Sequence, residues 1–145
     1  MLSIEERFSM AMHNAARTWR QALDRRLRHL GMGQASWLAI ATIAKSGNVP
    51  PSQAELAAKL GVEAPTMVSM IDRLVRSGYV LRQPSETDRR VKQVVLTEDG
   101  QKIYTSVKAE ANALRHELLR GLDRQRLADA ADVLEAVIAA AEAEA

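Results

Sequence analysis

Apolar residues recur at steps of three and four along the first 27 residues of the chain, which is the period of an amphipathic helix. Ser3 and Glu6 have the spacing of a capping box and mark its start, and the glycines within residues 31–33 mark its end. The apolar positions on this expected helix are Phe8, Met12, Ala15, Trp19, Leu23 and Leu27. A second helix is expected over residues 34–45, before the loop-forming segment 47–51.

Two short helices joined by a glycine-containing turn are expected next. Ser52 and Glu55 form a second capping box, and Gly61 is suited to the left-handed conformation that commonly closes a helix. Pro65 suits the first turn of the following helix, which we expect to end at Gly78. The apolar residues of this helix that we expect to be buried are Val68, Ile71, Leu74 and Val75. The pair predicts a helix-turn-helix.

Residues 79–81 and 93–96 are rich in strand formers and flank a polar segment, which predicts a β-hairpin. A hairpin directly after a helix-turn-helix is a wing, so the expected fold class is mainly α with a small β-hairpin wing. Further helices are expected over 98–120 and after Asp123. The apolar stripe of the last helix is Leu127, Ala131, Leu134, Val137 and Ile138. A single helix-turn-helix core cannot cover such a stripe fully, and closed two-fold pairing is the commonest solution, so we expect a homodimer.

Composition narrows the class of protein. The chain is 47% apolar and 26% charged but only 3% aromatic, so aliphatic residues and methionine must fill its core. The absence of cysteine excludes thiolate metal sites and cysteine nucleophiles. No apolar run approaches the roughly 18–20 residues that span a bilayer, and the N-terminus lacks the pattern of a signal peptide. We therefore expect a cytoplasmic protein with no membrane partner.

The net charge of +2 is too small to indicate nucleic acid by itself, but its distribution is uneven. The basic residues that gather in one short window are Arg73, Arg76, Arg82, Arg89, Arg90 and Lys92. A patch of this kind can neutralise phosphates. A solvated, charged hairpin explains the same charge equally well.

The helix after Pro65 has a short polar face that suits insertion into the major groove of DNA, where the first turns of a helix meet the base edges. Thr66 and Ser69 on its outer face can bond to bases or to phosphate. Met70 can touch a thymine methyl group, and Arg73 can reach the backbone or a guanine.

Asp88 and Arg90 lie two residues apart at the expected hairpin tip. An arginine at a wing tip can enter the narrow minor groove, where the potential is most negative. The aspartate two residues earlier lies on the same side of an extended chain and can hold the guanidinium in a bidentate pair. A surface ion pair of little energetic value is the alternative.

Several segments together resemble the MarR family of winged helix-turn-helix regulators. They are residues 55–62, 65–68, 71–78, 88–90 and 94–97. The two motifs most specific to the family are Asp-Arg-Leu at 72–74 with Gly78, and Asp-Arg-Arg at 88–90 with Leu-Thr at 96–97. Residues 17–20 together with Trp37 resemble the SlyA branch of that family.

The resemblance implies a single domain, 1–145, that forms a homodimer on a pseudo-palindromic site, usually as a repressor. Segments 1–33 and 98–145 would supply dimerisation helices, and 34–97 the lobe that binds double-stranded DNA. The DNA-binding residues expected on these grounds are Ser52, Gln53, Pro65, Thr66, Met67, Ser69, Met70, Arg73, Asp88, Arg89, Arg90 and Lys92. Several relatives have arginine where this chain has Ser69, so base readout here is expected to be weaker or different, with more dependence on DNA shape.

The resemblance also implies a small-molecule effector, often an aromatic carboxylate, that releases the DNA. Arg17 would pair with the carboxylate and Trp37 would stack on the ring. Met12, His13 and Arg20 are further effector-binding candidates. Core packing explains Trp37 and Met12 as well, a dimer-surface salt bridge explains Arg20, and His13 can be a solvent-facing residue.

Nothing in the sequence indicates an enzyme, a metal site or a cofactor. His13, His29 and His116 are scattered and have no partner at ligand spacing, and the chain has no Gly-rich phosphate loop and no Gly-x-Ser-x-Gly. A winged helix that binds protein, or one that binds DNA nonspecifically, is the alternative, because fold alone does not decide function. The basic wing favours a winged helix that binds DNA over one that binds protein.

Overall fold

The structure is a computed structural model that describes the backbone of residues 1–145 and all side chains except those of Gln34 and Ala35. The chain forms two compact units, Met1–Asn112 and Ala113–Ala145. The boundary between them lies within helix α5 (Glu98–Leu119). The expected division into a DNA-binding lobe, 34–97, and dimerisation helices on either side of it refers to a dimer, and it stays a prediction.

Helix α1 (Ile4–Leu27) begins where the sequence predicts. The Glu6 N–H donates to Ser3 Oγ at 3.1 Å and the Ser3 N–H donates to Glu6 Oε2 at 3.0 Å, so the capping box is complete. A 3₁₀ turn follows and closes at Gly31 with a φ of 73°, a left-handed conformation that glycine adopts without strain. Of the expected apolar stripe only Leu23 and Leu27 are buried. The N-terminal half of the stripe is exposed in the single chain.

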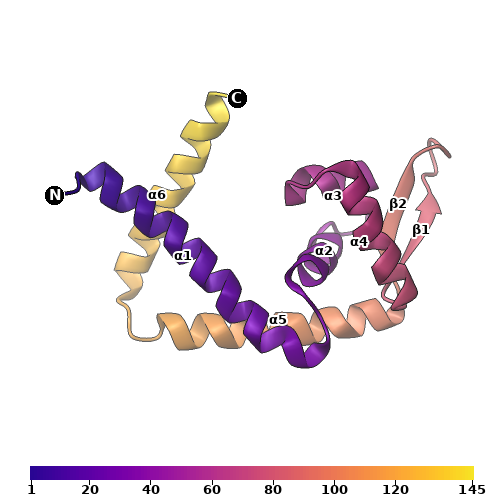
Figure 1. Ribbon diagram of the computed structural model, residues 1–145, viewed down its shortest axis with the longest axis horizontal. Helices are drawn as coiled ribbons and strands as arrows, with labels where there is room; N and C mark the ends of the chain where they lie inside the picture. Colours follow the sequence, from indigo (N-terminus) through magenta and orange to yellow (C-terminus); the bar gives the residue numbers. More distant parts are fainter. The chain divides into compact units, whose positions relative to one another are not determined.

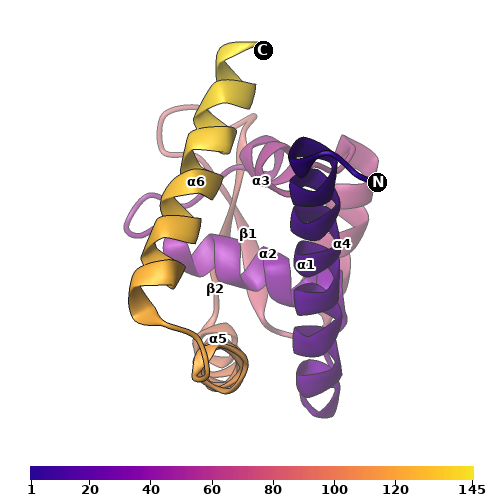
Figure 2. The same ribbon diagram turned by 90° about the vertical axis from the view of Figure 1, so that its left-hand side faces the viewer.

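Helix α2 (Gln34–Lys45) lies at the centre of the first unit. Helices α3 (Gln53–Leu60) and α4 (Ala64–Arg76) and the β-hairpin gather around α2, as Figure 1 and the perpendicular view in Figure 2 both show. The large side chains that are fully buried in this unit are Leu27, Ile40, Leu56, Met67, Ile71, Val80 and Val94. One aliphatic core therefore holds the helix-turn-helix and the hairpin together.

The predicted helix-turn-helix is confirmed. Ser52 caps α3 in a complete capping box with Glu55, and Gly61 ends that helix with a φ of 67°. Pro65 is the second residue of α4, where its missing N–H leaves no helical bond unmade. The start of both helices and the end of α3 therefore follow from the local signals in their sequence, and α4 ends at Arg76, two residues before Gly78.

The predicted wing is also confirmed. Strand β1 (Val80–Pro84) pairs with the antiparallel strand β2 (Lys92–Leu96) in a register that places Arg82 opposite Val94. The Val94 N–H also donates to the Pro51 carbonyl at 2.9 Å, and this bond fastens β2 to the start of α3. The wing is thus tied to the helix-turn-helix through backbone hydrogen bonds.

Helix α5 starts against the turn that precedes β1. Thr97 Oγ1 donates to the Gly78 carbonyl at 2.6 Å and accepts from the Gly100 N–H at 3.0 Å. A Cβ atom at Gly100 would lie 2.1 Å from the Tyr79 carbonyl oxygen, a distance that no side chain tolerates. Close backbone approach therefore explains a glycine in the first turn of this helix.

The second unit contains the end of α5 and helix α6 (Arg124–Ala143), which Asp123 caps through a 3.0 Å bond from the Gln125 N–H. α6 has no buried residue. Its exposed apolar side chains include Val133, Leu134, Val137 and Ile138. Along the part of the chain that the structure describes, no helix combines the length and apolar character that crossing a membrane requires.

Candidate nucleic-acid interface

One face of α4 is open to solvent and carries most of the residues that the sequence places outward. Pro65, Thr66, Ser69 and Arg73 are exposed and recur at helical spacing. Arg76 is also exposed and extends the same face toward the end of the helix. The face is thus small and polar in its first turns and cationic in its last.

Two residues expected to contact DNA from this helix point into the protein instead. Met67 is fully buried and Met70 is 5% exposed. They lie on one side of α4 with Ile71 and Leu74, at the three- and four-residue steps that define a helix face. The expectation that Met70 touches a thymine methyl group is therefore wrong, and so is the outward placement of Met67.

For Val68 the prediction is wrong in the other direction, because a residue predicted to be buried is exposed. It was expected in the core, but its side chain is 41% exposed. Two residues from Thr66 and one from Ser69, it lies at the edge of the open face, on the side toward β1. The helical period alone does not decide this position, because Val68 is three residues from Ile71 and lies at the boundary between the buried and the open face.

Arg82 of β1 joins the wing to both helices of the helix-turn-helix. Its Nη2 lies 2.7 Å from Asp72 Oδ1 and donates to the Val68 carbonyl at 3.1 Å. Its Nε donates to Gln53 Oε1. We call these contacts the Arg82 clamp. The sequence places Arg82 in a phosphate-neutralising patch, but in the structure its guanidinium is bound within the protein.

Gln53 and Ser52 were both expected to contact DNA. Gln53 is half-buried and its side-chain carbonyl is held by Arg82. Ser52 is 8% exposed, and its hydroxyl accepts the Glu55 N–H at 3.1 Å as the cap of α3. The expectation of a DNA contact from the Ser52 side chain is wrong, because the hydroxyl that begins the helix is covered and already bonded.

Asp88 and Arg90 form the pair that their spacing suggests. Arg90 Nε donates to Asp88 Oδ1 at 3.1 Å and Arg90 Nη2 to Oδ2 at 3.2 Å, a bidentate arrangement. The Arg90 N–H donates to Asp88 Oδ1 at 3.0 Å. These bonds lower the pKa of Asp88 below its usual value, and the guanidinium has a larger effect than the backbone N–H. The Arg90 side chain is nevertheless 91% exposed, so it is oriented without being covered.

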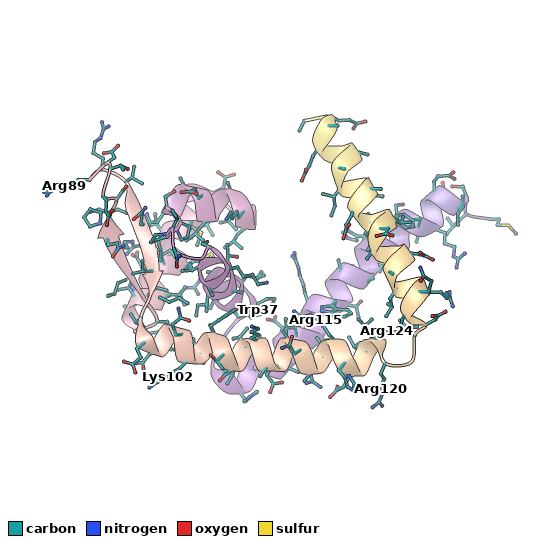
Figure 3. All side chains as sticks on the ribbon, turned by 180° about the vertical axis from the view of Figure 1, so that it is seen from behind. Trp37, Arg89, Lys102, Arg115, Arg120 and Arg124 are labelled. Atoms are coloured by element: carbon teal, nitrogen blue, oxygen red, sulfur yellow. The ribbon has the colours of Figure 1, made fainter. Side chains whose placement is uncertain are left out.

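The other cations of the wing are free of the core. Arg89 and Lys92 are exposed, and Figure 3 shows the Arg89 side chain at the hairpin tip, directed away from the helices. With Arg73 and Arg76 on α4, the lobe presents positive charge on both of the elements that a winged helix brings to DNA.

The effector-binding candidates divide into two groups. His13, Arg17 and Arg20 line one open hollow of about 350 Å³ along α1, together with Ala16 and Gln21. Arg17 Nη2 donates to Asn14 Oδ1 at 3.1 Å on the same helix. Two guanidinium groups and an imidazole in one hollow are suited to an anion.

Trp37 and Met12 do not line this hollow. Trp37 is 7% exposed, and its Nε1–H donates to Asp24 Oδ1 at 3.0 Å. Its indole therefore packs in the core and bridges α2 to α1, which favours core packing over stacking on a ligand as the role of Trp37. Met12 is exposed on α1. Within the described residues no group of three or more metal-ligating side chains comes together.

Comparisons with known proteins agree with this architecture. The model of the MarR family matches residues 33–92. The structure is similar to that of the transcriptional regulator PA3341, with 37% identity, a TM-score of 0.85, and 93% of this chain and 98% of that chain covered. It is also similar to a mutant MarR from E. coli complexed with operator DNA, with 25% identity, a TM-score of 0.78, and coverage of 89% and 91%.

A similar fold occurs in CouR from Rhodococcus jostii RHA1, which was crystallised with p-coumaroyl-CoA. That match has 20% identity, a TM-score of 0.79, and coverage of 94% and 95% of the two chains. At this identity it supports the fold alone.

The helix-turn-helix, the hairpin after it and the flanking helices define a winged helix-turn-helix protein. By the family model and by 37% identity to a transcriptional regulator over nearly its whole length, the chain belongs to the MarR family. Members of this family regulate transcription, and the protein is therefore a transcription regulator and not an enzyme.

Proposed function

We propose that this protein binds a pseudo-palindromic operator in double-stranded DNA as a homodimer and represses transcription from it. The observation that carries the proposal is the pairing of an open α4 face with an oriented, exposed Arg90 on the same lobe. A helix in the major groove beside an arginine in the minor groove is a common way for a winged helix to engage DNA.

The wing is arranged for such a contact. Asp88 occupies Nε and Nη2 of Arg90, and Nη1 takes part in neither bond. That edge remains available for the acceptors of the minor groove, whose negative potential attracts a guanidinium. Arg89 and Lys92 lie near enough in sequence to neutralise the adjacent phosphates. The E. coli MarR that resembles this chain was crystallised with operator DNA, which supports the proposal.

The dimer is proposed from uncovered apolar surface. α6 has no buried residue, although it carries Val137 and Ile138. The N-terminal half of α1 likewise exposes Phe8 and Met12. A second copy of the chain would cover both surfaces, and a two-fold axis would match the two half-sites of a pseudo-palindrome, about one helical turn apart.

We also propose that an aromatic carboxylate binds the hollow along α1 and releases the DNA in the cytoplasm. Arg17 and Arg20 would pair with the carboxylate, and His13 would line the same site. The protein would belong to the SlyA branch, which residues 17–20 of α1 and Trp37 of α2 resemble. Coupling between two ligands is reciprocal, so operator DNA should weaken effector binding by the factor by which the effector weakens DNA binding.

Fluorescence anisotropy with duplex DNA from upstream of the protein's own gene tests the proposal. Wild type should bind this duplex more tightly than a scrambled duplex, and Arg90→Ala should lose most of the preference. Arg120→Ala, which removes an exposed arginine of the second unit, is the matched control and should bind as wild type does.

Equal and weak binding to the native and scrambled duplexes would contradict sequence-specific regulation. A nonspecific DNA-binding protein would still show a steep dependence on salt, because each neutralised phosphate adds nearly one unit of slope. A protein-binding winged helix would show little binding and little slope.

A further inference from the structure

We propose that Val68 contacts the C5 methyl group of a thymine in the major groove, so that α4 recognises A·T pairs through apolar contact. The inference rests on the proposed function and specifies what the recognition helix reads. It gives Val68 the role that the buried Met70 cannot perform.

The placement of Val68 is unusual for the apolar residues of α4. Met67, Met70, Ile71 and Leu74 are buried, whereas 41% of Val68 is exposed. Valine is a weaker helix former than alanine, and its exposed surface contributes nothing to the core. The stability of α4 therefore does not require a valine here, and contact with a partner would give the exposed side chain a role.

The other side chains on the open face leave few means of reading bases. Through the first two turns that face carries Pro65, Thr66, Val68 and Ser69, and none of these has an amide or guanidinium group for a bidentate bond to a base. Gln53, the nearest amide on α3, is bound to Arg82. Beside the hydroxyls of Thr66 and Ser69, which bond to several bases alike, the start of α4 offers methyl groups, and the thymine methyl is their usual target in the major groove.

The Arg82 clamp holds Val68 in place for such a contact. Arg82 Nη2 bonds the Val68 carbonyl itself, at 3.1 Å, and Asp72 one turn later. A β-branched side chain in a helix also has one strongly preferred rotamer. Backbone and side chain are thus both ordered before DNA binds, so little entropy is lost on contact.

The test removes methyl groups from each partner separately: the C5 methyl from a thymine, and both γ-methyl groups from Val68 in Val68→Ala. A preferred duplex is first selected from a random pool with the wild-type protein, and each thymine is then replaced in turn by deoxyuridine, which lacks only the C5 methyl. At one thymine per half-site this should weaken wild-type binding about fourfold, the value of one buried methyl-sized group. In Val68→Ala the same replacement should have almost no effect.

Two further variants sharpen the comparison. Val68→Thr keeps one methyl group and should retain part of the uracil penalty. Val49→Ala shortens a valine that is 73% exposed outside α4, and it should keep the full wild-type penalty. Since each penalty is a ratio of two duplexes measured with one protein, a change in stability cannot imitate the result.

If Val68→Ala shows the wild-type penalty at every thymine, or if the selected duplexes contain no thymine with a penalty, the role of Val68 is overturned while DNA recognition stands. If the pool yields no preferred duplex, the proposed function fails and this inference fails with it.

Discussion

Arg82 Nη2 lies 2.7 Å from Asp72 Oδ1, and this ion pair joins the first strand of the wing to the middle of the recognition helix. The same guanidinium reaches Gln53 at the start of α3. A single side chain therefore ties together the three elements whose relative placement decides how the lobe meets DNA. Its own contact with DNA is not needed for this role.

Replacing Arg82 with alanine should lower both stability and DNA affinity. The ion pair is partly exposed, so we expect unfolding in urea to become easier by about 1–2 kcal/mol. Lysine at this position keeps the charge but loses the fork of donors, and it should recover only part of the loss.

A double-mutant cycle with Asp72→Ala isolates the pair. The two single changes should be non-additive, with a coupling of about 0.5 kcal/mol or more, as is usual for residues in direct contact. Additive effects would show that the ion pair contributes nothing to the stability of the lobe.

Removal of the Arg90 guanidinium should change the salt dependence of DNA binding and the titration of Asp88. The slope of log K against log salt should fall by about two units in Arg90→Ala, because each protomer of the proposed homodimer loses one cation that meets the DNA. An unchanged slope would place Arg90 outside the interface.

The sign of the Asp88 effect follows from its lowered pKa. The carboxylate is ionised, and the pair is intact, at every pH above the ordinary aspartate value of about 3.9; the pair is lost only as the pH falls through the lowered value. Operator binding between pH 5 and 8 should thus not vary through Asp88. An NMR titration of the carboxyl carbon should show the pKa rising in Arg90→Ala.

Gly100→Ala should destabilise the first unit. The new Cβ would meet the Tyr79 carbonyl at 2.1 Å, and relief requires α5 to move away from the turn. We expect a loss of about 1–3 kcal/mol in the free energy of unfolding.

Gly121→Ala is the matched control for this change. A Cβ at Gly121 would meet nothing within 4 Å, so its effect should stay within about 0.5 kcal/mol. Similar midpoints for the two variants in thermal unfolding would contradict the close contact at Gly100.

A charge on the apolar face of α6 should break the proposed dimer. Ile138 is 56% exposed in the single chain, and Ile138→Glu would bury a carboxylate in a two-fold interface. Sedimentation should then show a monomer. Leu81→Glu, at a 55% exposed position on β1, should leave the dimer intact. A wild-type protein that sediments as a monomer would refute the assembly.

Local signals in the sequence account for most element boundaries. Capping boxes at Ser3 and Ser52 begin α1 and α3 as predicted, Gly61 ends α3, and Gly31 closes the 3₁₀ turn that follows α1. Such signals are readable because their partners lie within three or four residues along the chain. The Asp88–Arg90 pair was predictable for the same reason.

The sequence predicts burial on α4 less well, because seven of its 13 residues are apolar and the helical period alone leaves the edges of the face open. Which edge is covered depends on where α2, α3 and β1 pack. Val68 was therefore assigned to the core and Met70 to the surface, and both assignments were wrong.

The sequence by itself determined the helices, the wing and the family, because each of these depends on residues that lie close together along the chain. The tertiary structure decided the tasks of Arg82, Trp37 and Ser52, all of which have polar groups bonded within the protein. Arg82 and Trp37 meet partners from other elements, and such partners come together only when the chain packs. Arg82, which the sequence places in a basic patch, therefore forms contacts within the protein, and Trp37, a candidate for ligand stacking, packs in the core.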